Sequence, residues 1–144
     1  MTTPGSQMVS AYEKAAGIDW IPRMLRKIRL NAEGKLPEDY LSNLGKGFDA
    51  RCVRFLGISY EILVARVLQG GTDDEVAAWC LASGSKPTGD QIQVWNEYMT
   101  KRSWRDLDSS PGKLQEHKEK SGLGDRADIL TFFDYYEVDE GRKP

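Results

Sequence analysis

Four cationic side chains lie within seven residues near the start of the chain, close enough together to bind one anion. They are Arg23, Arg26, Lys27 and Arg29. Guanidinium and ammonium groups donate charge-assisted hydrogen bonds to phosphates and carboxylates. Two interpretations remain open. The cluster binds a phosphate, a carboxylate or an acidic partner, or it is a solvated helix face that acids elsewhere in the fold partly neutralise. The second is the commoner fate of a charged helix face.

The C-terminal end of the chain is rich in carboxylates. Six acidic residues fall in a stretch of sixteen, with Arg126 inside it and Arg142 just beyond: Asp125, Asp128, Asp134, Glu137, Asp139 and Glu140. This charge asymmetry predicts that the acidic end packs against the basic N-terminal helix. Asp134 lies between aromatic positions, where a partly buried carboxylate can act as a general acid or base. A structural ion pair is the favoured alternative, because ion-pair networks also occupy such positions.

The residues that most often carry nucleophilic or metal chemistry are sparse. Cys52 and Cys80 lie on apolar stripes, where a thiol packs as a small hydrophobe, and the single histidine, His117, lies in the most polar segment. A reactive cysteine needs a neighbouring base or an electropositive site. One histidine and two distant cysteines do not make a zinc site, and neither a calcium loop nor a phosphate loop occurs. We therefore expect no metal and no cofactor.

One amide side chain is a further candidate. Asn96 lies at the edge of the apolar stripe that contains Trp95. A buried amide needs hydrogen-bond partners, so Asn96 either locks two helices together, which we favour, or contacts a ligand. With the charged residues it completes the candidate ligand-binding set: Arg23, Lys27, Arg29, Asn96, Arg126, Asp128 and Asp134.

Short amphipathic helices must position these residues. Glycine recurs at nearly regular intervals in the first half of the chain, and a glycine directly after an apolar run ends a helix, since it adopts the left-handed conformation without a Cβ clash. The patterns predict helices over 20–32, from Pro37 to Gly45, over 48–56, after the N-caps Ser59, Thr72 and Thr88, and after an N-cap at Asp125. Thr72 and Thr88 each begin a capping-box sequence.

The fold class that follows is all-α: a compact single-domain bundle of about six to eight short helices. Residues 1–10 are predicted to form a flexible N-terminal arm, and residues 11–142 a single helical domain that begins with a short helix over 11–16. Apolar periodicity fades over 101–124. We expect an exposed connection there, either an exposed helix or a mobile segment.

Composition narrows the setting of the protein. A chain of 144 residues suits one domain with a real core. The net charge of −2 and the pI of about 5.5 argue against a nucleic-acid partner. The longest unbroken apolar stretch, 76–82, is far shorter than the roughly 18 residues that span a bilayer. We therefore expect no nucleic-acid partner and no membrane partner. Because two cysteines do not make a disulfide framework, we also expect a cytoplasmic protein.

The chain resembles a bacterial family of small helical proteins catalogued only as a domain of unknown function. The resemblance spans about residues 21–142 and depends on several short pieces in order. They are Arg23-Met24 with Lys27 and Arg29, Asp49, Phe55 with Gly57-Ile58, Thr72 to Val76 with Trp79, Trp95-Asn96, Arg126 with Asp128-Ile129, Phe133-Asp134, and Asp139 to Arg142. The resemblance implies a helical fold in a bacterial cytoplasm and implies no activity.

Two functions fit these observations. The first is a non-enzymatic cytoplasmic binding or adaptor module with an unknown protein partner, motivated by the lack of a nucleophile–base or metal constellation and by the charge-segregated ends. The alternative is a protein or enzyme that binds a small anionic ligand through an Arg/Asp site. The alternative requires Arg23, Arg29 or Arg126 to converge with Asp128 or Asp134 on one pocket. We lean towards a protein that is not an enzyme.

Overall fold

The computed structural model describes residues 8–144, which form eight helices and one small two-stranded sheet. The elements in order are β1 (Lys14–Ala15), β2 (Ile18–Asp19), α1 (Ile21–Ala32), η1 (Glu38–Asn43), α2 (Phe48–Leu56), α3 (Tyr60–Leu68), α4 (Asp73–Ser83), α5 (Gly89–Thr100), α6 (Ser110–Lys120) and α7 (Phe132–Asp139). The element η1 is a 3₁₀-helix. The prediction of a single-domain bundle of six to eight short helices is confirmed.

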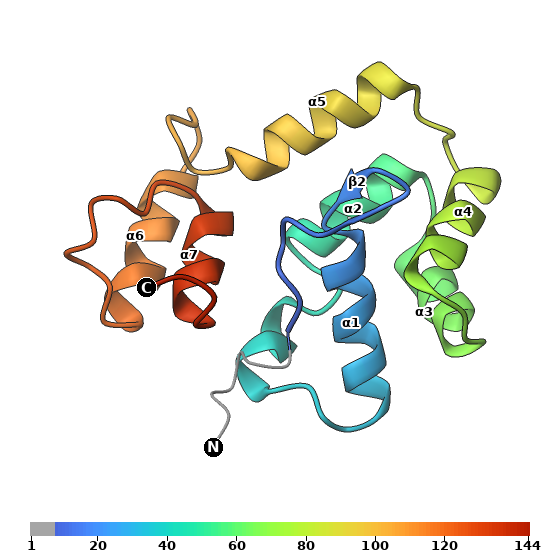
Figure 1. Ribbon diagram of the computed structural model, residues 1–144, viewed down its shortest axis with the longest axis horizontal. Coiled ribbons are helices and arrows are strands. Elements are labelled where there is room, and N and C mark those ends of the chain that lie inside the picture. Colours follow the sequence, from blue (N-terminus) through green and yellow to red (C-terminus); the bar gives the residue numbers. More distant parts are fainter. Residues whose placement is uncertain (1–7) are drawn as a thin grey trace.

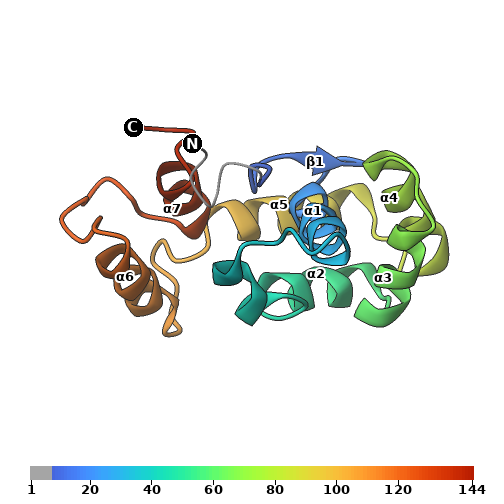
Figure 2. The ribbon, with the colours of Figure 1, turned by 90° about the horizontal axis from the view of Figure 1, so that it is seen from below.

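Helix α1 is the centre of the bundle. Figure 2 shows it between the β1–β2 hairpin on one side and α2 and α3 on the other. Its apolar face, including Ile21, Met24 and Leu25, is fully buried. Helices α6 and α7 lie together at one end of the molecule, and α5 joins them to the rest (Figure 1). The chain thus has a larger body around α1 and a smaller helical unit beside it.

The N-terminal part of the domain differs from its prediction. Residues 11–16 were expected to form a helix that ends at Gly17, but the chain forms an antiparallel hairpin in which Lys14 pairs with Asp19 and Ala15 with Ile18. The two residues between the strands, Ala16 and Gly17, both have positive φ angles of 52° and 77°. A two-residue hairpin turn requires this conformation at both positions, and Gly17 supplies it as a turn residue rather than as a helix stop.

The predicted N-caps are confirmed where the capping interaction is local. The Ser59 hydroxyl accepts the backbone N–H of Ile62 at 3.2 Å. Thr72 and Thr88 each form a complete capping box, with Glu75 and Gln91 as the reciprocal partners. Each box satisfies two backbone N–H groups that the first turn of a helix leaves without partners.

The last helix begins later than expected. Asp125 does not cap it; the N-cap is Thr131, whose hydroxyl accepts the backbone N–H of Asp134 at 3.1 Å. The buried ammonium group of Lys118 explains the delay, because it donates to the backbone carbonyls of Arg126 and Ile129 at 2.6 and 3.2 Å. These contacts hold the segment before α7 in a turn conformation.

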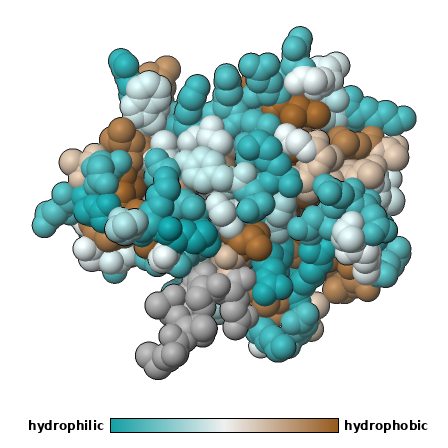
Figure 3. Space-filling model, viewed as in Figure 1, coloured by the Kyte–Doolittle hydropathy of each residue, from teal (hydrophilic) through white to brown (hydrophobic). Residues whose placement is uncertain are grey.

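Two segments expected to lie on the outside are packed in part. Of the predicted arm 1–10, residues 1–7 lie outside the described part of the chain, whereas Met8 is buried. Over 101–124 the chain forms helix α6, and Leu114 and Lys118 bury one of its faces. The other faces of α6 are exposed, and polar residues cover most of the molecular face in Figure 3.

Candidate functional site

A cleft of about 890 Å³ separates the two parts of the molecule. One wall comes from α1, η1 and the start of α2, and the other from α6, α7 and the segment after α5. Seven lysines and arginines line the cleft, against five aspartates and glutamates. The lining is therefore positively charged on balance, although the whole chain has a net charge of −2.

An ion pair between distant parts of the chain closes the floor of the cleft. Arg23 of α1 donates to both carboxylate oxygens of Glu140, at 2.8 and 2.6 Å, and both side chains are about 2% exposed. Glu140 also accepts hydrogen bonds from the Tyr40 hydroxyl, at 2.7 Å, and from Arg142. Burial alone would raise the pKa of Glu140, but the hydrogen bonds and charge of Arg23 outweigh it and hold this pKa below its usual value.

A second buried ion pair lies one turn further along α1. The Lys27 ammonium group is 2.7 Å from an oxygen of Asp49, and neither side chain is more than 5% exposed. Asp49 also accepts the Trp20 indole N–H at 2.9 Å and the Gly45 backbone N–H at 3.0 Å. Burial lowers the pKa of Lys27 even though the negative charge of Asp49 opposes that shift.

Trp20 is held between these pairs in a strained backbone conformation. Its φ of 81° lies in the left-handed region, which costs a bulky residue about 1–3 kcal/mol. Arg23 and Lys27 lie 5.6 and 5.2 Å from its ring centroid, and Phe133 stacks on it at 5.7 Å. Backbone strain and buried charge are both costly, and here they occur together beside one cleft. Such features concentrate at functional sites.

The rim of the cleft carries cations that no described carboxylate neutralises. They are Lys46, Arg51, Lys113 and Lys120. The guanidinium of Arg51 donates to the Tyr98 hydroxyl at 2.8 Å, which leaves its charge uncompensated. Lys113 and Lys120 lie on one face of α6 with His117 between them, because positions three and four residues apart share a helix face.

Another cation on the wall of the cleft is already paired. Arg102 is 7% exposed and binds Asp106 and Asp108 at 2.9 and 3.0 Å. Its Nε is buried and has no hydrogen-bond partner among the described residues. The acids without an ion-pair partner, Glu38, Asp39 and Asp139, are on η1 and at the end of α7. The cations and the acids that lack ion-pair partners therefore belong to different elements around the cleft.

The predicted basic helix is only partly a solvated face. Arg23 and Lys27 are 2% and 4% exposed, so the interpretation of a solvated face is wrong for them, whereas neutralisation by distant acids is confirmed. The predicted packing of the acidic C-terminal end on this helix is confirmed by the contact of Arg23 with Glu140. Arg29 is half-buried and pairs with Asp73 at the start of α4, and it does not line the cleft.

The other predicted site residues lie outside the cleft. The Asn96 carboxamide accepts the Asp19 backbone N–H at 2.9 Å and donates to the Gly17 carbonyl at 2.8 Å, so it joins α5 to the hairpin. Arg126 and Asp128 form an exposed ion pair with each other, in which the hydrogen bond from Arg126 lowers the pKa of Asp128 to about 2. Asp134 accepts the Tyr12 hydroxyl at 2.6 Å. The seven predicted residues do not converge on one pocket.

The cysteines have the environment that the sequence predicts. Cys52 and Cys80 are both free and buried. Burial raises the pKa of the Cys52 thiol well above its usual value and that of Cys80 to about 11, so both thiols stay protonated at neutral pH. Within residues 8–144, no three histidine, cysteine or acidic side chains are grouped so as to hold a metal ion.

Several residues of the cleft and of the ion pairs in its floor were not among the sequence candidates. Glu140 and Asp49 were noted only as part of the acidic end and of the family resemblance, and Lys113, His117 and Lys120 as part of a polar segment. These last three residues are separated by four and three positions, which places them on one helix face, and this spacing was the pattern that could have indicated them. The sequence contains no comparable signal for Tyr40 or Tyr136, which reach the cleft through the tertiary fold.

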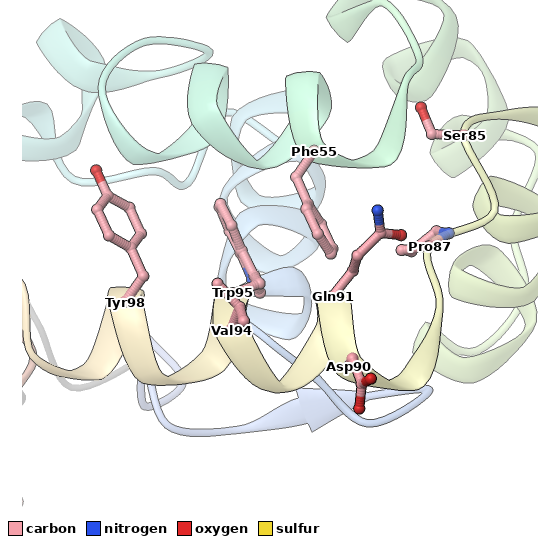
Figure 4. Close-up of a pocket in the computed structure, with 8 residues that line it drawn as sticks. All are labelled: Phe55, Ser85, Pro87, Asp90, Gln91, Val94, Trp95 and Tyr98. Atoms are coloured by element: carbon pink, nitrogen blue, oxygen red, sulfur yellow. The ribbon is translucent and has the colours of Figure 1, made fainter.

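A second, apolar groove lies between α2 and α5. It has a volume of about 470 Å³, and the rings of Phe55, Trp95 and Tyr98 point into it (Figure 4). Phe55 and Trp95 stack with centroids 4.8 Å apart and an interplanar angle of 12°. Trp95 also donates its indole N–H to the Asp19 carbonyl at 3.1 Å, which ties it into the core. The stack is accounted for by packing between α2 and α5.

The protein is thus small and helical, with a charged cleft between its two parts. The chain belongs to the family described as a domain of unknown function, DUF5069, whose model matches residues 6–142. This confirms the resemblance to a domain-of-unknown-function family. No curated protein matches the chain. None of the helices in the described part of the chain is both long and apolar enough to cross a membrane.

Proposed function

We propose that this protein binds a small anionic ligand in the cleft between the α1–η1–α2 wall and the α6–α7 wall. The observation that carries the proposal is the set of cations without ion-pair partners on the rim: Lys46, Arg51, Lys113 and Lys120. The volume of about 890 Å³ falls within the range of roughly 300–1,000 Å³ that small-molecule sites occupy. Four cations on facing walls can reach one phosphate or carboxylate group from two sides.

The energetics of the floor support a binding site at this place. The Arg23–Glu140 and Lys27–Asp49 pairs lose hydration on burial, so each contributes less to stability than an apolar contact of similar size would. The left-handed Trp20 adds backbone strain. Stability alone does not explain why three such costly features occur together at one cleft. A rigid floor beneath the cations of the rim gives them a common purpose.

A non-enzymatic binding role suits these side chains better than catalysis. The acids of the floor are fully engaged with cations, and both cysteines lie in the core away from the cleft. A protein adaptor remains a prediction, but Arg23 and Lys27 cannot form its contact surface, because they are almost completely buried. We also propose a bacterial cytoplasmic location, which the family resemblance and the two free cysteines support.

The test is calorimetric titration of the full chain with inorganic pyrophosphate. A hydrogen bond to a charged group contributes about 1.5–3 kcal/mol, so loss of two lysines should weaken binding at least about tenfold. We expect that loss for the Lys113→Ala/Lys120→Ala double variant. Lys101→Ala removes an exposed lysine outside the cleft and is the matched control. Absence of saturable binding to the unaltered chain, or equal weakening in the control, would refute the proposal.

A further inference from the structure

We infer that the ligand of the cleft carries a flat aromatic ring joined to its anionic group, as a nucleoside monophosphate does. The inference rests on the proposed anion site and adds the chemical class of the ligand. Three aromatic side chains of the cleft carry it: Phe48 from the α2 wall, and His117 and Phe132 from the α6–α7 wall.

These three rings form one contiguous aromatic patch on the cleft, which we call the slot. The Phe132 ring is close to perpendicular to His117, at 74° with centroids 6.0 Å apart, and to Phe48, at 83° with centroids 5.6 Å apart. A flat guest in the cleft can contact rings of this patch on both walls. Aromatic side chains bind nucleobases through such ring contacts, and the contacts tolerate different bases because every base has a π-face.

The slot is accessible on the ligand side. His117 is exposed on α6 and Phe48 is half-buried, whereas Phe132 is 9% exposed and forms the back of the slot. The Tyr135 ring, whose centroid is 6.0 Å from that of His117, also lines the cleft. The imidazole of His117 is therefore both in contact with aromatic rings of the cleft and open to a ligand.

The cations lie where the anionic group of such a ligand would be. Lys113 precedes His117 by four positions, so the two side chains are neighbours on one helix face, with Cβ atoms about 5–6 Å apart. On the facing wall, Lys46 and Arg51 flank Phe48 in the sequence at the start of α2. Each face of the slot therefore has a cation within a few residues of its ring.

The charge balance of the cleft favours an anionic ligand over the other common guest of an aromatic patch, a cationic ligand. Aromatic cages bind ammonium groups by cation–π attraction when carboxylates surround them. The lining of the cleft holds seven lysines and arginines against five acids, and the acids without ion-pair partners belong to η1 and the end of α7. An anionic ring compound fits this distribution.

The experiment compares ligands that share a phosphate and differ in the ring. AMP and UMP carry a base, ribose 5-phosphate lacks it, and inorganic pyrophosphate provides the anion alone. Stacking on aromatic side chains makes an affinity difference of about tenfold or more per base. We expect AMP or UMP to bind the full chain at least tenfold more tightly than ribose 5-phosphate, as measured by calorimetry.

A pair of variants isolates the ring contact. His117→Ala should remove most of the nucleotide advantage and leave ribose 5-phosphate binding unchanged. Glu116→Ala is the control, since Glu116 is exposed on the same helix and does not line the cleft. If ribose 5-phosphate and both nucleotides bind equally well, the inference about the ring is overturned while the anion site stands. If none of the four compounds binds, the proposed function itself fails.

Discussion

Replacing Glu140 by glutamine should destabilise the protein strongly. The substitution keeps the shape of the side chain but removes the charge that faces the buried guanidinium of Arg23. Breaking a buried ion pair from one side costs about 3–5 kcal/mol, because it leaves an uncompensated charge. The amide oxygen can still accept hydrogen bonds from Tyr40 and Arg23, so we expect a value near the lower limit, about 3 kcal/mol.

The size of the chain converts this value into a measurable shift. For a domain of 144 residues, each kcal/mol corresponds to roughly 3–4 °C, so Glu140→Gln should lower Tm by about 10 °C. Urea unfolding followed by circular dichroism gives the free energy of unfolding directly. Asp128→Asn removes the acid of an exposed ion pair and should leave the unfolding curve unchanged, because surface pairs contribute little.

A double-mutant cycle separates the ion pair from the other contacts of Glu140. Arg23→Met alone leaves the carboxylate buried without its main partner. In the Arg23→Met/Glu140→Gln double variant, the loss should be smaller than the sum of the two single losses by about 2–3 kcal/mol. If Glu140→Gln unfolds within about 1 kcal/mol of the unaltered chain, or if the two losses simply add, the account of the cleft floor is incorrect.

Three further predictions concern stability. Because the folded pKa of Glu140 lies below its unfolded value of about 4.5, its contribution is present above that pH and is lost as the pH falls through the folded pKa. Glu140→Gln should therefore lose less stability than the unaltered chain as the pH falls below about 4.5, as measured by urea unfolding. Gly57→Ala should cost well over 2 kcal/mol of unfolding free energy, because the φ of Gly57 is 72° and a Cβ would lie 1.9 Å from the Ser85 hydroxyl oxygen. Gly17→Ala, with open space around the new Cβ, should cost only about 1 kcal/mol. Similar Tm values for the two variants would contradict this. Asn96→Ala leaves the Asp19 backbone N–H without its acceptor and should lower the free energy of unfolding by about 1–3 kcal/mol, as measured with denaturant. Gln93→Ala, at an exposed position of the same helix, is the control. Equal stability of the two variants would rule out the joining role of Asn96.

Features decided within a few residues could be predicted from the sequence. The capping boxes at Thr72 and Thr88 depend on contacts three positions apart, and both are present. The same local approach was wrong for Ala16–Gly17, since a glycine after a short apolar segment fits a helix end and a hairpin turn equally well. The hairpin is held by long-range contacts instead, since Asn96 of α5 accepts the Asp19 backbone N–H and donates to the Gly17 carbonyl.

The candidate site could be predicted only in part, because it depends on long-range contacts. The basic and acidic ends were expected to meet, and Arg23 does meet Glu140, 117 positions away. The burial of that pair depends on how α7 docks on α1, which no local pattern encodes. His117 was hidden for a related reason: its helix is polar on most faces, and its contacts with Phe132 and Tyr135 come from the tertiary fold.

The most direct test of the anion site is an NMR titration of the ¹⁵N-labelled full chain with inorganic pyrophosphate. The account predicts saturable amide shifts concentrated at residues 46–51 of the α2 wall and 110–121 of α6, the two segments that carry the unpaired cations. Exposed lysines outside the cleft, such as Lys86 and Lys101, should shift little. Shifts spread evenly over all exposed lysines, or confined to the apolar groove around Trp95, would contradict the assignment of the cleft as the binding site.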